Sequence, residues 1–190
     1  MRILMIGDVV GRPGRQAVAQ YLPVLTSRYQ VDFIVCNAEN AAAGAGITAE
    51  IARTLLEEVG IHVITLGNHA WARKEIYPYL NTETRILRPF NYPPVVPGRG
   101  YGVYEIPAGR IGVIALQGRT FMEPVDDPFR AIDTILNEVL PQTRIVLVDF
   151  HAEATSEKQA FAWYVDGRVS AVIGTHTHVQ TADERILPSG

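Results

Sequence analysis

The sequence lacks most features of an exported, membrane-spanning or nucleic-acid-coating protein. It has one cysteine, Cys36, so an intrachain disulfide framework is excluded. No apolar run approaches the length of a membrane span, and Gly7-Asp8 interrupts the first run too early for a signal peptide. The formal net charge is only −3, so no strongly basic surface would attract duplex nucleic acid over long range. We therefore expect a soluble, cytoplasmic protein that does not bind membranes.

The sequence does contain enough apolar residues for a sizeable core. Hydrophobic residues make up 47% of the 190 positions, and there is no evident repeat or low-complexity tract. This composition suits one compact domain, so we interpret residues 1–190 as a single domain. Cys36 ends the apolar run Phe33–Cys36, where a buried structural thiol is expected rather than a catalytic one.

Short apolar runs alternate with amphipathic segments along the chain. The runs are brief and rich in β-branched residues, so they predict buried strands at 3–6, 33–36, 63–66, 111–116, 145–148 and 171–173. Helices are predicted at 14–28, 48–58, 128–140 and 155–164, with Thr48 and Thr155 as N-caps. The alternation predicts an α/β fold with a largely parallel sheet. The proline-rich stretch 85–104 predicts a surface excursion or antiparallel strands.

Metal-ligand side chains follow almost every predicted strand. They are Asp8, Glu39, Asn40, Asn68, His69, His151, His176 and His178. Ligands in open α/β sheets bind at the carboxyl ends of strands, which is where these side chains should lie. The pair His176 and His178 is the strongest signal, because alternate residues of an extended segment face the same side. Residues far apart in the sequence would thus build a two-metal site.

Each of these residues also has an ordinary explanation when taken alone. Asp8, Asn40 and Asn68 are common turn or cap residues. His151 can be a hydrogen-bonded histidine near the core. Such independent explanations account poorly for so many ligands at corresponding strand ends, so a shared site is favoured. His62 precedes its apolar run, at the opposite strand end, and we assign it a structural or surface role.

This series of motifs resembles the calcineurin-like metallophosphoesterase superfamily. Within it, Gly7-Asp8-Val9-Val10-Gly11, Asn37-Ala38-Glu39-Asn40 and the stretches 151–158 and 174–183 resemble the YmdB-like bacterial phosphodiesterase branch. The resemblance spans essentially the whole chain. It implies a four-layer α/β/β/α sandwich and hydrolysis of phosphodiester bonds, with 2′,3′-cyclic nucleotides as the expected substrates. Family members usually continue past residue 190, so we expect the domain to be incomplete at the C-terminus, without its last strands.

The resemblance implies a ligand set for two metal ions. One ion would take Asp8, Glu39, Asn40 and His178, and the other would take Glu39, Asn68, His151 and His176, with Glu39 as the bridge. A hydroxide between the ions would attack the phosphorus atom in line. His69 resembles the family's proton donor to the leaving oxygen, and the alternative is an imidazole that only supports its neighbour Asn68.

Two departures from the wider superfamily bear on the metal. Val10 stands where the first motif normally carries a histidine, and Glu39 replaces the usual bridging aspartate. Fewer imidazoles and more oxygen ligands weaken the preference for zinc. We therefore expect two divalent or mixed-valence transition-metal ions, with iron or manganese favoured and zinc as the alternative.

Two arginines lie in loops that should approach the same edge of the sheet. Arg12 and Arg119 have planar guanidinium groups that bind phosphate well, although either can equally be a solvated surface residue. The expected partner is a small phosphodiester or cyclic nucleotide. Strong duplex nucleic-acid binding is not expected, and a homo-oligomer is compatible with the sequence.

Rival functions are less compatible with the residues. A haloacid-dehalogenase phosphatase needs an aspartate at the position where this chain has Val10. A metallo-β-lactamase-like enzyme needs Asp-His where this chain has Gln180-Thr181. A dinucleotide-binding module needs a glycine fingerprint that the first strand lacks. The alternative left open is a metal-binding regulatory or scaffold protein with little turnover, because a ligand set indicates capacity for metal and not catalysis.

Overall fold

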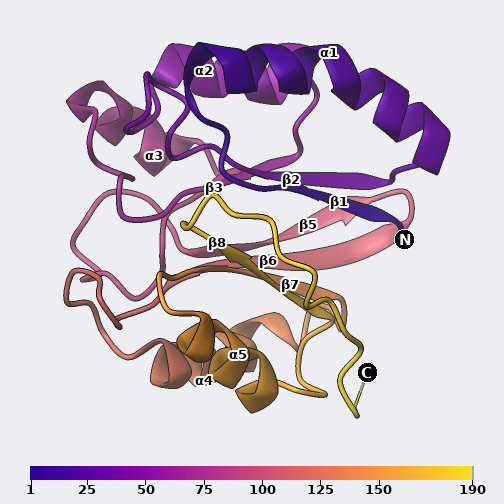
Figure 1. Cartoon of the computed structure of the whole chain (residues 1–190), viewed down its shortest axis with the longest axis vertical. Helices are drawn as coiled ribbons and strands as arrows, with labels where there is room; N and C mark the ends of the chain where they lie inside the picture. The colour runs from indigo at the N-terminus through magenta and orange to yellow at the C-terminus, as the bar shows by residue number, and fades with distance from the viewer. Residues whose placement is uncertain (190) are drawn as a thin grey trace.

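Within residues 1–189, two four-stranded sheets lie face to face, with helices on the outer side of each (Figure 1). The computed structural model describes residues 1–189. The elements are β1 (Ile3–Ile6), α1 (Gly11–Tyr29), β2 (Phe33–Asn37), α2 (Ala49–Arg53), the π-helical η1 (Thr54–Glu58), β3 (Val63–Thr65), the 3₁₀ turn η2 (Lys74–Ile76), α3 (Tyr77–Thr82), β4 (Ile86–Leu87), β5 (Tyr101–Ile106), β6 (Gly109–Gln117), α4 (Pro128–Val139), β7 (Val146–His151), α5 (Thr155–Tyr164) and β8 (Ala171–Thr175). The predicted four-layer α/β/β/α sandwich is confirmed.

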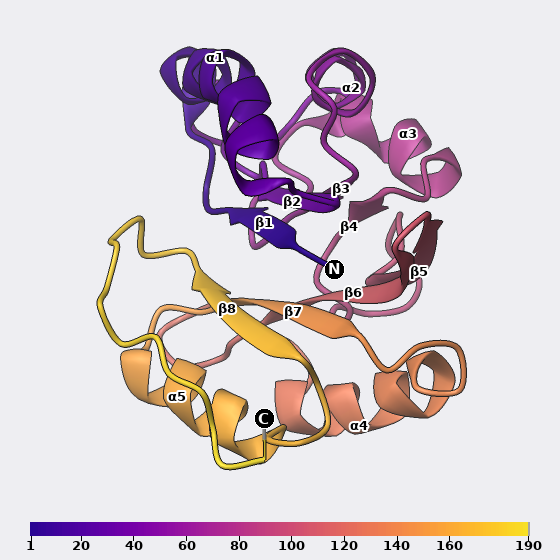
Figure 2. The ribbon, with the colours of Figure 1, turned by 90° about the vertical axis from the view of Figure 1, so that its right-hand side faces the viewer.

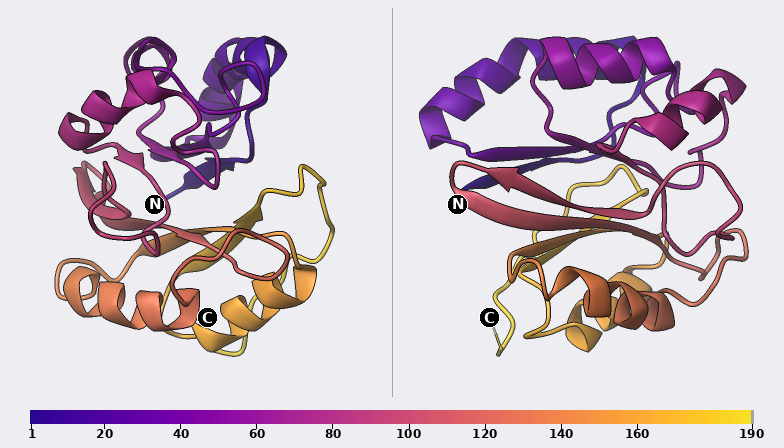
Figure 3. Two further views of the ribbon diagram at one scale, coloured as in Figure 1. Left: turned by 90° about the vertical axis from the view of Figure 1, so that its left-hand side faces the viewer. Right: turned by 180° about the vertical axis from the view of Figure 1, so that it is seen from behind.

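The first sheet is wholly parallel and has the order β1-β2-β3-β4. Its outer face is covered by α1, α2 and α3 (Figure 2). The second sheet has the order β5-β6-β7-β8, in which β5 is antiparallel to β6 and the others are parallel. Helices α4 and α5 cover its outer face (Figure 3). The proline-rich stretch 85–104 contains the short β4 and the start of β5. Of the two alternatives stated for it, that of antiparallel strands holds for β5, whereas the parallel β4 was not predicted.

Alternation along the buried strands gives each sheet two apolar faces. In β2, Phe33 and Val35 pack between the sheets, whereas Ile34 and Cys36 pack under the helices. The layer between the sheets is completed by Val63, Leu87, Ile111, Val113, Ala115 and Leu147. Strands buried on both faces appear as continuous apolar runs in the sequence, which is why they were recognisable there. Cys36 is fully buried, as predicted.

Side-chain caps account for where two of the helices begin. Thr48 Oγ1 accepts a hydrogen bond from Ile51 N at 3.2 Å, so the predicted N-cap of α2 is confirmed. The prediction for Thr155 was wrong, because Ala154 occupies the N-cap position of α5 and Thr155 is already helical. Asp127 caps α4 by accepting from Phe129 N and Arg130 N.

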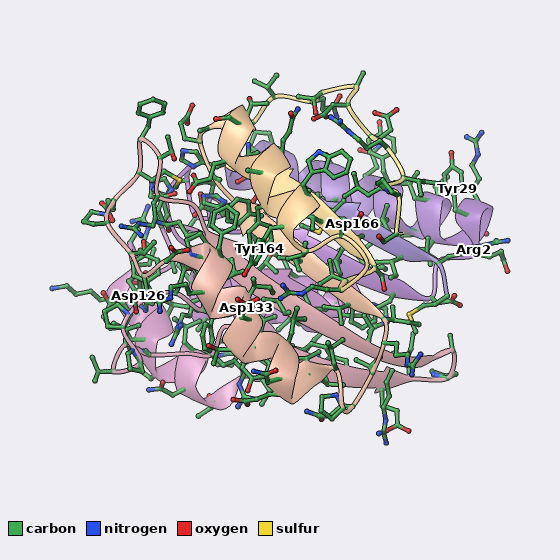
Figure 4. The ribbon with its side chains drawn as sticks, turned by 90° about the horizontal axis from the view of Figure 1, so that it is seen from below. Arg2, Tyr29, Asp126, Asp133, Tyr164 and Asp166 are labelled. Carbon is green, nitrogen blue, oxygen red and sulfur yellow. The ribbon has the colours of Figure 1, made fainter. Side chains whose placement is uncertain are left out.

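The outer helices of the second layer are linked at the surface. Tyr164 of α5 donates a hydrogen bond to Asp133 of α4 at 2.6 Å, and Figure 4 shows the two side chains pointing toward each other.

Among residues 1–189, no helix has the length and apolar character that crossing a membrane requires. His62 accepts a hydrogen bond from Ile34 N at 3.2 Å, at the strand end opposite the candidate ligands.

Candidate metal centre

The seven predicted ligands meet at the carboxyl ends of strands from both sheets. The first sheet contributes Asp8, Glu39, Asn40 and Asn68, and the second contributes His151, His176 and His178. After β8 the chain leaves its sheet and rises toward the first one, as the yellow segment in Figure 2 shows. Asp8 Oδ2 accepts a hydrogen bond from His176 N at 3.0 Å and so joins the two sheets. Packing of the sheets therefore assembles the site.

One group of ligand atoms surrounds the imidazole of His151, which is fully buried. Its Nε2 atom lies 2.9 Å from Asn68 Oδ1, 3.1 Å from His176 Nδ1 and 3.2 Å from Glu39 Oε1. Ligand atoms of Glu39, His151 and His176 all lie within 4.8 Å of one another, the spacing of a metal-binding group. This is the set that the resemblance assigned to the second ion.

A second group of ligand atoms surrounds His178. Its Nε2 atom lies 3.1 Å from Asn40 Nδ2 and 3.7 Å from Asp8 Oδ1. Asn40 Nδ2 also donates to Glu39 Oε1 at 3.1 Å, so Glu39 lies between the two groups. The amide oxygen of Asn40 faces His69 here, and ligation through that oxygen requires the amide to turn over.

The chemistry of these residues fits bound metal. An imidazole nitrogen offers one proton or one lone pair, so His151 Nε2 cannot satisfy three polar neighbours by hydrogen bonding alone. When two neighbouring ligand atoms each lie about 2.1 Å from an octahedral ion, they lie about 3.0 Å from each other. The distances from His151 Nε2 to its three neighbours are close to this value. Asp8 Oδ1 is buried and has no hydrogen-bond partner among the described residues, which a cation would supply.

The electrostatics favour a charged bridge. Burial would raise the pKa of the Glu39 carboxyl, but the hydrogen bond and charge of His151 and the backbone N–H of His69 lower it to about 2. Glu39 is therefore ionised at neutral pH. Burial lowers the pKa of His176, and the neighbouring His151 lowers it further, so the His176 imidazole is kept neutral. Burial lowers the pKa of His151, but Glu39 and two nearby carboxylates together raise it by a larger amount. A bound cation would lower the pKa of His151 again, because the nitrogen that ligates a metal must lose its proton.

His69 lies at the open side of these two groups. Its backbone N–H donates to Glu39 Oε2 at 3.0 Å, and its Nδ1 atom lies 2.7 Å from Asn40 Oδ1. The side chain is 40% exposed, and Nε2 has no hydrogen-bond partner within residues 1–189. The ring is thus held through one nitrogen while the other is available to a substrate, as a proton donor requires.

Comparison with known proteins gives the family. A family model described as YmdB-like protein matches residues 4–190. This chain belongs to the YmdB-like family. It is 50% identical to a Bacillus subtilis (strain 168) protein described as a 2′,3′-cyclic-nucleotide 2′-phosphodiesterase, over all of this chain and 72% of that protein.

Solved structures of similar proteins share the fold of this YmdB-like chain. A hypothetical protein from Thermus thermophilus is 49% identical with a TM-score of 0.93, over 100% of this chain and 73% of that one. A structure described as a novel phosphatase, from Mycoplasma pneumoniae, is 35% identical with a TM-score of 0.90, over 99% of this chain and 68% of that one. The metallophosphoesterase fold is therefore established for the chain.

Sequence reasoning assigned no role to two residues that support the ligands of this YmdB-like chain, Glu153 and Gly67. Glu153 Oε2 lies 3.1 Å from His176 Nε2, which leaves His176 Nδ1 facing His151. Gly67 lies so close to His151 that a Cβ atom there would come within 2.2 Å of the ring. The available signal was position, because Gly67 directly precedes Asn68 and Glu153 follows His151 by two residues.

The two predicted phosphate-binding arginines lie outside the ligand group. Arg12 is exposed and lines an open surface cavity of about 270 Å³ with Arg15 and Thr48, and the seven ligands, all described, are not part of that lining. Arg119 directs its guanidinium toward Asp127 at 4.0 Å. Within the described chain, neither guanidinium forms a hydrogen bond or ion pair with a predicted ligand. Their contact with substrate stays a prediction.

Proposed function

We propose that this YmdB-like chain is a phosphodiesterase that hydrolyses 2′,3′-cyclic nucleotides with two transition-metal ions bridged by Glu39. The observation that carries the proposal is the division of the ligand atoms into two groups around one buried, ionised carboxylate. The Bacillus relative supports the substrate class, and family membership supports a hydrolase acting on a small phosphate ester. The domain proposed is the whole span of residues 1–190.

Each proposed role follows from the placement of a side chain. When bound, the ions would supply Lewis-acid stabilisation of the phosphoryl oxygens and activate the attacking water. Asp8, Asn40 and His178 would hold one ion, and Asn68, His151 and His176 the other. Glu39 would link the two groups as their shared ligand, because its Oε1 atom lies 3.2 Å from His151 Nε2 and 3.1 Å from the Asn40 amide. His69 would donate its proton to the departing sugar oxygen.

The charge of the site supports a diester over a monoester. Asp8 and Glu39 are the only carboxylates of the ligand set, so they neutralise two divalent cations only in part. The excess positive charge suits a diester monoanion, whereas a monoester dianion also competes as a metal ligand. Iron or manganese is proposed over zinc, because four of the seven ligands offer oxygen. Cytoplasmic location and homo-oligomer formation stay predictions from the sequence.

A substrate panel on the purified protein tests the proposal. The specificity constants would be measured for a 2′,3′-cyclic nucleotide, a linear diester and a matched monoester, beside the metal content of each preparation. The expected order places the cyclic diester first, and Glu39→Gln should lose most of its metal and its turnover. Glu50→Gln makes the same change on an exposed turn of α2 and should behave as wild type. A large preference for the monoester would contradict the proposal and indicate a phosphatase.

A further inference from the structure

A buried polar network lies directly behind His151, between the two sheets. Its centre is Asp149 of β7, which is 1% exposed. Asp149 Oδ2 accepts hydrogen bonds from Thr65 Oγ1 at 2.5 Å and Asn37 Nδ2 at 3.0 Å, and both donors belong to the first sheet. Asp149 Oδ1 accepts from Thr175 Oγ1 of β8 at 2.6 Å. Burial raises the pKa of Asp149, but all three partners donate to it, which favours the ionised carboxylate and holds it in one orientation.

Thr175 connects this carboxylate to His151. Its Oγ1 atom lies 3.0 Å from His151 Nδ1. A hydroxyl has a single proton, and Thr175 donates that proton to Asp149, so Thr175 can only accept from His151. His151 must then carry its proton on Nδ1. The lone pair of Nε2 then faces Glu39 Oε1 and Asn68 Oδ1, two acceptors with which it is compatible only when a cation such as the proposed ion lies between them.

We propose that Asp149, acting through Thr175, fixes the tautomer of His151 in which Nε2 is free to bind metal. The inference deepens the proposed function and rests on it, because it concerns the same site. Within residues 1–189, the hydrogen bonds of Asp149 go to Asn37, Thr65 and Thr175 and to none of the seven predicted ligands, so Asp149 is a positioning residue. Metal-ligating histidines commonly donate their other N–H to a partner that fixes the ring, and here that partner is a hydroxyl relayed to a buried carboxylate.

The substitution Asp149→Asn should reverse the chain of hydrogen bonds. Thr65 and Asn37 are both donors, so the remaining amide oxygen would stay on their side. The new amino group would then face Thr175 and donate to it. Thr175 would turn its own proton toward His151 Nδ1, which moves the His151 proton to Nε2 and opposes the metal. Metal affinity should fall by about 10–100-fold.

The tautomer itself can be observed without any turnover. Nitrogen-15 NMR of the histidine rings, in metal-free protein at a pH above the imidazole titration, separates Nδ1–H from Nε2–H forms. The His151 signals are assigned by their loss in His151→Gln. Glu39 Oε1 favours a proton on Nε2 in both proteins, so the readout is the difference between them: we expect a larger Nδ1–H fraction in the wild type than in Asp149→Asn. Zn²⁺ affinity, measured by competition with a fluorescent chelator, should fall in parallel in Asp149→Asn.

Two control variants separate positioning from simple loss of structure. Thr65→Val removes a donor from the same carboxylate but leaves the Thr175 link, so tautomer and affinity should stay near wild type. Thr175→Val should lower the affinity for Zn²⁺, whereas Thr175→Ser, which keeps the hydroxyl, should bind Zn²⁺ as well as the wild type. If Asp149→Asn does not fold, this pair of variants tests the role of the Thr175 hydroxyl. An Nδ1–H fraction in Asp149→Asn equal to that of the wild type, or equal losses of affinity in Asp149→Asn and Thr65→Val, would overturn the inference. A tautomer that switches as expected in a protein without diesterase turnover would overturn the proposed function alone.

Discussion

At the scale of single residues, Gly67 determines how closely the first sheet can approach His151. A methyl group at this position would lie 2.2 Å from His151 Cδ2 and Nε2, far inside van der Waals contact. Because the ring is buried between the sheets, it has little room to retreat. Gly67→Ala should therefore displace the ring, lower metal affinity by about 10–100-fold and cost about 1–3 kcal/mol of folding stability. Metal titration and urea unfolding measure the two effects.

Gly7→Ala is the matched control for this change. Gly7 also directly precedes a predicted ligand, but a Cβ atom there would meet nothing within 4 Å. Metal affinity and stability should therefore stay close to wild type. If both alanine variants bound metal equally well, the close packing of Gly67 on His151 would have no bearing on the site.

His69 allows a test of proton donation that is separate from metal binding. If the His69 imidazolium protonates the departing oxygen, the requirement for it grows with the basicity of that oxygen. His69→Gln should slow hydrolysis of a cyclic nucleotide by about 10²–10⁴-fold and slow a nitrophenyl diester far less. The metal content should not change, because Asn68 rather than His69 is the proposed ligand. Equal losses on both substrates would assign His69 to phosphate binding instead.

At the scale of the elements, the start of α2 provides a direct comparison between two threonines. Thr48 Oγ1 caps α2, whereas Thr155 lies inside the first turn of α5 and caps nothing. Thr48→Ala should lower stability by about 0.5–2 kcal/mol, and Thr155→Ala should change it by a few tenths at most. Urea denaturation measures both. A loss for Thr155→Ala as large as that for Thr48→Ala would contradict the assigned cap.

Most elements could be predicted because their residues are locally informative. Strands buried on both faces, such as Phe33–Asn37, require a continuous apolar run, and that run is visible in the sequence. The two-residue β4 is too short to give a pattern, and β5 has only one residue in six that is exposed, without clean alternation. The N-cap prediction for Thr155 was wrong because a hydroxyl before an amphipathic segment does not determine which residue begins the helix.

At the scale of the whole molecule, the proposed centre exists only while the two sheets are packed together. Ligands come from both sheets, so bound metal should link them and stabilise the folded state. Metal at a concentration of 100 times its Kd should add about 2.7 kcal/mol to the unfolding free energy. Thermal unfolding with and without metal measures this, and Glu39→Gln should lose most of the increment. An equal rise of Tm in Glu39→Gln would place the bound metal elsewhere.

The sequence contained the identities of the candidate ligands but not their surroundings. Ligands such as Asp8 and His151 could be placed because carboxyl ends of parallel strands meet at one edge. The division into two sheets followed from family resemblance, since no local pattern shows which strands pair. The roles of Thr175 and Asp149 were missed because they depend on contacts between residues at least 24 positions apart in the sequence. These residues lie on strands whose pairing was unknown.

The most direct test is the dependence of turnover on metal occupancy. Metal-stripped protein would be reconstituted in steps with manganese or iron(II), and hydrolysis of a 2′,3′-cyclic nucleotide would be followed beside metal content per chain. Turnover should be absent without metal and should rise until about two ions are bound per chain. Full turnover with no metal, or at one ion per chain, would contradict a dinuclear phosphodiesterase. Full occupancy without turnover would instead indicate a metal-binding regulatory protein.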